Sequence, residues 1–124
     1  MNEYIPWDVY NFATRGDSTS LTAALAINSN RSNWYTDEYG WNALHWATCN
    51  GHLNCITILI NSGIDVDSKN NANDTALSFT AIDGHLQYME LLLARGADIN
   101  SRNNYNKTAL HLSLIHISEP TRPY

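Results

Sequence analysis

Apolar residues recur at helical spacing in two separate parts of the chain, and each stripe predicts an amphipathic helix. A glycine follows each stripe, at Gly63 and Gly96, and glycine adopts without strain the left-handed conformation that ends many helices. We therefore expect two helices of similar length whose apolar sides face neighbouring elements. The stripes are Leu53, Ile56, Leu59 and Ile60, followed by Leu86, Met89, Leu92 and Leu93.

A shorter helix is predicted in front of each stripe. Asn42 and Thr75 stand directly before an apolar stretch, where a short side-chain oxygen can accept from the N–H groups of the first helical turn. Gly51 and Gly84 then end this helix after roughly two turns. Thr108 begins the same pattern a third time. The pattern predicts a series of helix-turn-helix units.

The units repeat with one strict period along the chain. A residue that tolerates positive φ precedes each unit, as Gly40, Asn73 and Asn106, because asparagine adopts this conformation most readily after glycine. The recurrence indicates a repeat protein in which every unit folds alike. The pairs that return at this period are Ala43-Leu44, Ala76-Leu77 and Ala109-Leu110, and Gly51-His52 and Gly84-His85.

This period, roughly 33 residues, together with the motif resembles the ankyrin-repeat family. The resemblance covers about residues 8–111, and the stretch "GHLQYMELLLARGADIN" at 84–100 is especially characteristic. It implies an all-α solenoid of stacked helix-turn-helix units that are joined by β-turn or hairpin loops. The family's Thr-Pro-Leu-His motif appears as Asn42-Ala43-Leu44-His45, Thr75-Ala76-Leu77-Ser78 and Thr108-Ala109-Leu110-His111.

The resemblance also divides the chain into consecutive units. Residues 112–122 are set apart because they resemble, codon for codon, the translation of a transposase-type sequencing adapter. We expect the genuine sequence to end near His111, which would leave Leu92 and Leu93 under-covered and open to non-specific self-association. The units are 1–36 as an atypical N-terminal capping repeat, 37–69 and 70–102 as ankyrin repeats, 103–111 as the start of a truncated repeat, and 112–124 as a non-native tail.

The first unit matches the repeat less closely than the others. Asp8 is predicted to cap a helix that Gly16 ends, and Leu21, Ala24 and Leu25 are predicted to line a second helix. The first helix aligns with the next repeat at an offset of 34, and the second aligns at an offset of 33. One residue is therefore expected to be missing from the turn between them.

His45, Cys49 and His52 lie within ten positions, and Cys55 follows, so a zinc site or a cysteine nucleophile has to be weighed. Gly51, which is expected to end a helix, lies inside this cluster, and Cys55 belongs to the apolar side of the next helix. A structural zinc site needs four converging ligands, and no third group that would orient a Cys-His pair is identifiable. The resemblance implies that the motif histidines are structural hydrogen-bonding residues. The chain is therefore expected to hold no metal or cofactor and not to be an enzyme.

Composition narrows the class of partner. The 124 residues carry a formal net charge of -5 without a cluster of Lys and Arg, whereas nucleic-acid affinity depends on clustered cations. Nucleic acid is therefore not an expected partner. The longest apolar run, at 55–60, is far shorter than the ~18 residues that span a bilayer, so no membrane segment is expected. With two cysteines that do not resemble a disulfide framework and no recognisable signal peptide, a cytoplasmic location is expected, with the nucleus as the alternative.

The resemblance implies a protein–protein interaction module that binds a protein partner through a concave surface of turn tips and first helices. Tyr39, Trp41 and Tyr105 are the expected anchors, because Tyr and Trp dominate many binding surfaces, whereas Trp46 and Phe79 are expected to be partly packed. The alternative function is a targeting or regulatory ankyrin arm of a larger enzyme or channel, truncated here. The expected contact residues are Glu38, Tyr39, Trp41, Cys49, Asn50, Asn71, Ala72, Asp74, Ile82, Asp83, Asn104, Tyr105 and Lys107.

Overall fold

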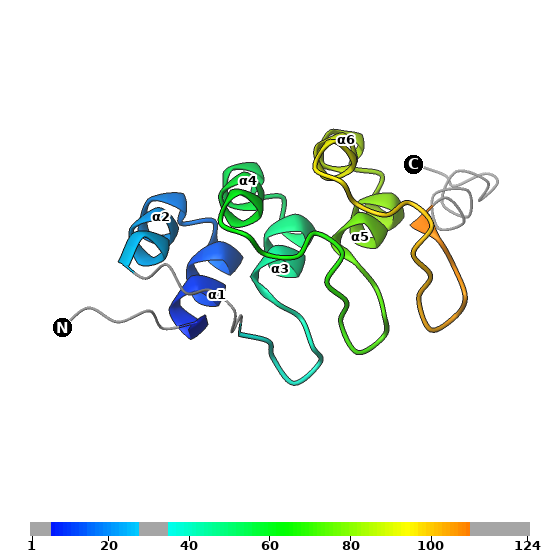
Figure 1. Cartoon of the computed structure of the whole chain (residues 1–124), viewed down its shortest axis with the longest axis horizontal. Coiled ribbons are helices and arrows are strands. Elements are labelled where there is room, and N and C mark those ends of the chain that lie inside the picture. Colours follow the sequence, from blue (N-terminus) through cyan, green and yellow to red (C-terminus); the bar gives the residue numbers. More distant parts are fainter. Residues whose placement is uncertain (1–5, 28–34, 110–124) are drawn as a thin grey trace, which may run out of the picture.

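Three helix pairs make up the part of the chain that the computed structural model describes, residues 6–27 and 35–109. The helices are α1 (Pro6–Arg15), α2 (Ser18–Ile27), α3 (Ala43–Cys49), α4 (Leu53–Asn61), α5 (Ala76–Asp83) and α6 (Leu86–Ala94). Figure 1 shows α1, α3 and α5 in one row and α2, α4 and α6 in a second row, with loops that project beyond the first row. These two ranges contain no strand, and the predicted all-α stack of helical units is confirmed.

The predicted caps begin the short helices α3 and α5. Asn42 Oδ1 accepts from the N–H of His45 at 3.0 Å, and His45 Nδ1 accepts in return from the N–H of Asn42 at 3.0 Å. Thr75 and Ser78 make the same reciprocal pair at 3.4 and 3.3 Å. Each box satisfies two N–H groups that would otherwise lack partners at a helix start. The N-cap predictions for Asn42 and Thr75 are confirmed.

Left-handed residues end the helices and shape the turns where the sequence predicts them. Gly51 and Gly84, with φ of 75° and 71°, follow α3 and α5. In the turns before the units, φ is 78° at Gly40 and 60° at both Asn73 and Asn106. Asparagine therefore keeps the turn conformation in the later repeats, as expected.

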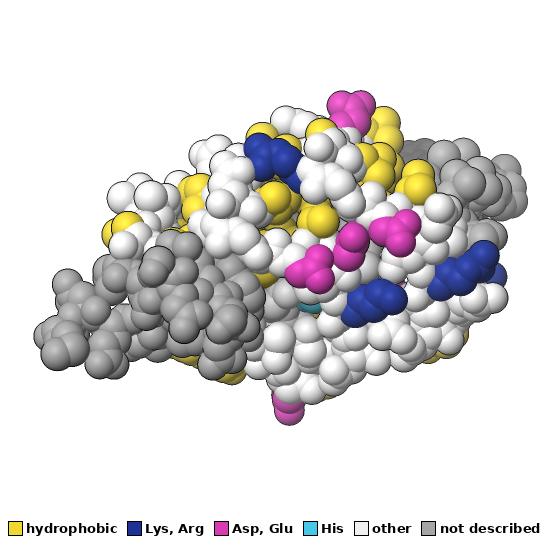
Figure 2. Space-filling model, in the orientation of Figure 1, with side chains coloured by type: hydrophobic (Ala, Val, Ile, Leu, Met, Phe, Trp, Pro, Cys, Tyr) yellow, Lys and Arg dark blue, Asp and Glu magenta, His cyan; other side chains and the backbone are white. Residues whose placement is uncertain are grey.

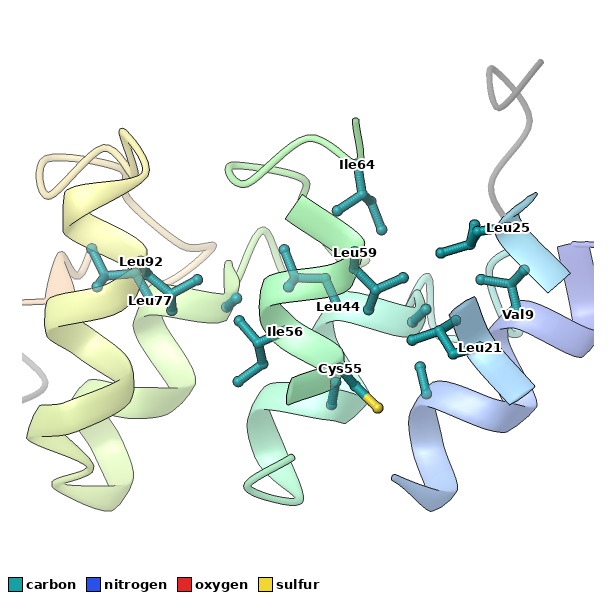
Figure 3. Packing of buried hydrophobic residues seen from close by; sticks show 14 of the residues in the cluster. Val9, Leu21, Leu25, Leu44, Cys55, Ile56, Leu59, Ile64, Leu77 and Leu92 are labelled. Atoms are coloured by element: carbon teal, nitrogen blue, oxygen red, sulfur yellow. The ribbon is translucent and has the colours of Figure 1, made fainter. Parts of the chain in front are cut away.

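One continuous apolar core runs through all three helix pairs (Figure 3). Leu44 and Leu77 enter it from the first helices, and Ile56, Leu59 and Leu92 enter it from the second helices. Burying each of these side chains contributes about 1.5–3 kcal/mol. Because every pair covers one side of the next pair, the fold is stabilised mainly by contacts between neighbouring units.

The apolar stripe of α6 is buried along one edge only. Leu92 is 0% exposed, so the expectation that it is under-covered is wrong, whereas Leu93 is 37% exposed as expected. Leu86, which was expected to face the core, is 66% exposed. At about 100° per residue, Leu86 and Leu93 lie almost in line, while Leu92 lies about 120° further round the helix. The core therefore contacts the Leu92 edge of α6 and leaves Leu86 largely in solvent.

The first helix pair corrects two expectations. α1 begins at Pro6, so Asp8 is not the residue that precedes the helix, as expected, but lies in its first turn. There its negative charge interacts favourably with the positive end of the helix dipole. The left-handed glycines Gly16 and Gly51 end the first helices of the two pairs, and Ser18 and Leu53 begin the second helices. The sequence offset between the two glycines is the same as the offset between the two helix starts. The expected offsets of 34 and 33 are therefore wrong, and no residue is missing from the turn. The small apolar residues of α1 match the next repeat in more than one register, which is why the sequence alone misplaces them.

Some expectations concern parts of the chain beyond the described ranges. The expected tail, 112–124, lies outside them, as do Leu110 and His111 of the third motif. Among the helices of the described ranges, none is both long and apolar enough to cross a bilayer.

Candidate functional site

The loops that project beyond α3 and α5 share one internal design. We call residues 36–41, 69–74 and 102–107 loop 1, loop 2 and loop 3. In each loop one Oδ1 acceptor takes hydrogen bonds at 2.9–3.0 Å from the backbone N–H groups two and four residues further on. The loops therefore hold a fixed shape without being strands. The three residues that supply this Oδ1 are Asp37, Asn70 and Asn103.

A ladder of asparagines joins the loops to one another. Asn71 donates its backbone N–H to Tyr39 O and its Nδ2 to Glu38 O, both at 3.0 Å. Asn104 repeats this one unit later, donating to Ala72 O at 2.9 Å and to Asn71 O at 3.1 Å. Both asparagines are expected contact residues, and the structure places their amides between loops. They therefore fix the spacing of the loop tips.

Two further expected contact residues make contacts between units. Asp74 accepts from Asn103 Nδ2 at 3.0 Å, which adds a further hydrogen bond between loops 2 and 3. Asn50 Nδ2 donates to the carbonyl of Thr14 at 3.0 Å and so joins α3 to α1. Position in the repeat identified these residues, but the carbonyls and amides they meet come from distant parts of the chain.

Three aromatic side chains pack where loop 1 crosses α3 and α5. The Trp41 ring stacks on Phe79 with centroids 4.5 Å apart and an interplanar angle of 18°, and it lies 4.5 Å from the Trp46 ring at 38°. Trp41 is half-buried, so this expected anchor is partly packed within the chain. Loop 1 turns its indole toward the next unit, and no local pattern records that contact. Partial packing of Trp46 is confirmed, whereas Phe79 is packed more fully than expected and is buried.

Asp37 holds a negative charge among these aromatic rings. Its Oδ2 accepts from the Tyr10 hydroxyl at 2.9 Å and from Trp46 Nε1 at 3.1 Å, in addition to the two loop amides on Oδ1. Burial alone would raise the pKa of this carboxyl, but the hydrogen bonds from Trp41 N–H, Trp46, Tyr10 and Tyr39 N–H hold the pKa below its usual value. Burial, followed by the bond to Asp37 and its charge, raises the pKa of Tyr10 to about 12.

The sequence reasoning did not include Asp37 among the site residues. The signal that could have found it is its position, because Asn70 and Asn103 stand at the same place in the next two units. An acid where the later units have amides marks the one loop whose acceptor is charged.

The expected contact residues whose side chains stay exposed lie on one side of the stack (Figure 1). We call this side, made of loops 1–3 and the solvent-facing parts of α1, α3 and α5, the first-helix face. Tyr39 is 66% exposed and Tyr105 is 79% exposed, with the smaller Ala72 at the equivalent position between them. The other expected contact residues that are exposed are Glu38, Asn50, Asn71, Ile82, Asp83, Asn104 and Lys107.

The histidines of the motif have structural partners. His45 is fully buried, and its Nε2 lies 2.9 Å from Ser68 O while Nδ1 accepts from Asn42. Burial lowers the pKa of His45, against the opposing effects of the Ser68 carbonyl and the Asp37 and Asp74 charges. His52 Nε2 lies 3.2 Å from Thr14 O in the preceding unit. The predicted structural role of both histidines is confirmed.

The two cysteines are free thiols with raised pKa values. Cys49 is half-buried and Cys55 is buried. Burial, and then the nearby charge of Asp83, raises the pKa of Cys49, and burial followed by the charge of Asp17 raises the pKa of Cys55. Because the thiolate is the nucleophile and the metal ligand, both shifts disfavour such chemistry. Within the described residues, no group of three or more His, Cys, Asp or Glu side chains could hold a metal ion.

Comparison of the sequence with models of known protein families identifies the repeats. A model described as ankyrin repeats in three copies matches residues 7–70, and one described as ankyrin repeats in many copies matches residues 59–113. The chain belongs to the ankyrin-repeat family. The first match includes α1 and α2, so the atypical first pair belongs to the ankyrin stack. Ankyrin repeats are generally protein–protein interaction modules and are typically non-catalytic.

Proposed function

We propose that this ankyrin chain binds a protein partner through its first-helix face. The observation that carries the proposal is that Tyr39 and Tyr105 are highly exposed on loops whose spacing is fixed by the Asn71 and Asn104 rungs. Exposed tyrosines on a pre-organised backbone lose little conformational entropy on binding and supply large contact area. The proposal also covers a chain that serves as an arm of a larger enzyme or channel, because the contact surface is the same.

The second-helix row offers a less suitable surface. A shallow groove between α2 and α4 is lined mainly by small hydroxyl and alanine side chains, among them Thr22, Ala26 and Thr57. Such side chains rarely dominate binding energy. We therefore place the partner on the loop side of the stack.

Selection of binders from a random peptide library on the immobilised full chain tests this function. The strongest binder is then mapped by amide chemical-shift changes and measured against Tyr39→Ala and Tyr105→Ala. We expect each substitution to weaken binding by about tenfold or more, as for a central aromatic anchor. Leu86→Ala is the matched control, because Leu86 on α6 is as exposed as Tyr39, at 66%. Binding that depends on Leu86 and not on the tyrosines would refute the proposal.

A weak second association is proposed for α6. Leu86, Leu93 and Ile99 are exposed apolar side chains on or just after this helix, and such groups favour contact between copies at high concentration. We propose that they mediate non-specific self-association. Sedimentation should show mass rising with concentration, and Leu86→Glu should suppress the rise; an unchanged rise in this variant would exclude α6 as the contact.

A further inference from the structure

We infer that the partner segment on the first-helix face is basic and that it places an arginine side chain against the Trp41 and Trp46 rings. The inference rests on the proposed function and specifies the chemistry of the partner. Three observations carry it: the distribution of acids, the charge on Asp37, and the geometry of the two indoles.

Acidic side chains are spread along the middle of the first-helix face. Glu38 is exposed on loop 1, Asp74 lies on loop 2, and Asp83 is exposed at the end of α5. Asp37 and Asp74 are close enough to act on buried His45, and Asp83 is close enough to act on Cys49. These acids therefore lie around α3. The described cations of the same face are Arg15 at the end of α1, Lys69 and Arg102 at the first positions of loops 2 and 3, and Lys107 in loop 3.

Elsewhere the exposed charges are mixed. Figure 2 shows acidic and basic side chains next to one another on the face turned to the viewer. Exposed Asp65 and Asp98 lie just before loops 2 and 3, and each is followed four residues later by the cation that begins the loop, Lys69 or Arg102. These acids have basic neighbours in the chain, so they provide a natural control for the acids around α3.

The hydrogen bonds of loop 1 do not require a charged acceptor at Asp37. Asn70 and Asn103 organise loops 2 and 3 with a neutral Oδ1 in the same hydrogen bonds. The four groups that donate to Asp37 are all neutral and leave its full negative charge in place. A carboxylate at this position therefore adds an electrostatic field to the face beyond its role in the loop.

The adjacent indoles suit a planar cation. Trp41 and Trp46 are half-buried, 4.5 Å apart at 38°, and tryptophan is the side chain whose ring face attracts cations most strongly. A guanidinium can stack on such a ring and donate two parallel hydrogen bonds to a carboxylate, which an ammonium cannot do. Because Asp74 and Asp83 lie on the same face, on loop 2 and at the end of α5, the surface favours arginine over lysine.

Three synthetic peptides test the inference by calorimetry on the full chain. They share one Gly/Ser/Leu framework and carry three arginines, three lysines or three glutamates at the same positions. We expect the arginine peptide to bind most tightly and to alter tryptophan emission, and the glutamate peptide to bind at least about tenfold more weakly, a difference of about 1.4 kcal/mol. Asp74→Asn with Asp83→Asn should weaken the arginine peptide about tenfold. Asp65→Asn with Asp98→Asn removes the same charge and should change binding less than threefold.

The outcomes separate this inference from the proposed function. Equal losses in the two double variants, equal binding of arginine and glutamate peptides, or no binding of any peptide would overturn the inference. A non-basic binder that still depends on Tyr39 and Tyr105 would overturn it and leave the proposed function standing. Binding that is insensitive to both tyrosines and to both double variants would remove the two together.

Discussion

At the scale of single residues, the sequence predicts backbone conformation better than side-chain contacts. Positive φ at Gly40, Asn73 and Asn106 follows from steric limits that act within one residue. The stacking of Trp41 on Phe79 depends on where loop 1 meets α5, which one residue type cannot record. Asp37 shows both cases. Its hydrogen bonds within loop 1 follow from its position in the repeat, but its contacts with Tyr10 and Trp46 depend on the stacking of the units.

Asp37→Asn should destabilise the chain. An amide can keep the Oδ1 bonds of the loop, but its Nδ2 cannot accept from Trp46 Nε1, and the bonds to a charged acceptor are lost. We expect a cost of about 1–3 kcal/mol, measured by urea unfolding. Asp65→Asn is the control, since Asp65 is exposed and should change stability by less than about 0.5 kcal/mol. Equal stability of the two variants would show that the Oδ2 contacts contribute nothing.

Gly40→Ala should cost more than Gly63→Ala. Both glycines are left-handed, with φ of 78° and 99°, so alanine strains the backbone by about 1 kcal/mol at either site. A Cβ at Gly40 would also lie 2.8 Å from the backbone nitrogen of Asn71, whereas nothing lies within 4 Å of one at Gly63. Displacing Asn71 breaks the hydrogen bond from its N–H to Tyr39 O, which adds about 1 kcal/mol to the loss of stability. Thermal unfolding measures the difference, and equal melting temperatures would contradict the close approach.

At the scale of elements, helix boundaries follow from the sequence where capping is local. Asn42 and Thr75 begin α3 and α5 as predicted because their partners, His45 and Ser78, lie three residues away. The sequence places the start of α1 too late, because Asp8 is a residue type that often caps helices, whereas the helix begins at Pro6 and contains Asp8 in its first turn. In α3 the capping box uses a histidine, so we expect the start of this helix to depend on pH.

As the pH falls, the capping box at the start of α3 should weaken before carboxylates become protonated. The pKa of His45 in the fold lies below its ordinary value of 6.5, because burial disfavours the cation. The unfolded chain therefore binds a proton near pH 6.5 while the folded chain does not, so this contribution is complete above pH 6.5 and is lost as pH falls below it. Protonated Nδ1 cannot accept from Asn42.

The variant His45→Ser tests this sign, because Ser78 forms the equivalent box without a titrating group. Urea unfolding at pH 7 and pH 5.5 should show a smaller loss of stability in His45→Ser than in the unmodified chain. His85→Ser, at an exposed position, is the control and should leave the loss unchanged. If His45→Ser lost as much stability as the unmodified chain, the pH dependence would have to arise elsewhere.

At the scale of the whole molecule, the repeat period predicts the stack but not which loop residues are available to a partner. Periodicity places Asn71, Asn104 and Tyr105 in equivalent loops, which the structure bears out. It does not reveal that the asparagines join neighbouring loops while Tyr105 stays exposed. Contacts between units involve residues about one period apart, so they follow only once the stacking geometry is known.

The stack should open first at its third helix pair. In the second pair Leu53 and Ile60 are half-buried, whereas their equivalents one period later, Leu86 and Leu93, are exposed. In solenoids each unit is stabilised chiefly by its neighbours, and segments with fewer buried apolar contacts open at lower free energy. Hydrogen exchange should therefore be faster in α6 than in α4. The Tyr88 hydroxyl, which donates to Gly51 O at 3.0 Å, joins α6 to the second pair.

Tyr88→Phe removes that bond and keeps the ring, so the amides of α6 should lose about 1 kcal/mol of protection while those of α4 change little. Thr57→Ala is the matched control, because its hydroxyl bonds to Leu53 O within α4 itself. A local response in α6 alone would show that the third pair opens as its own unit. Uniform protection from residue 76 onward, or equal changes in both helices, would mean that the described stack opens as one cooperative body.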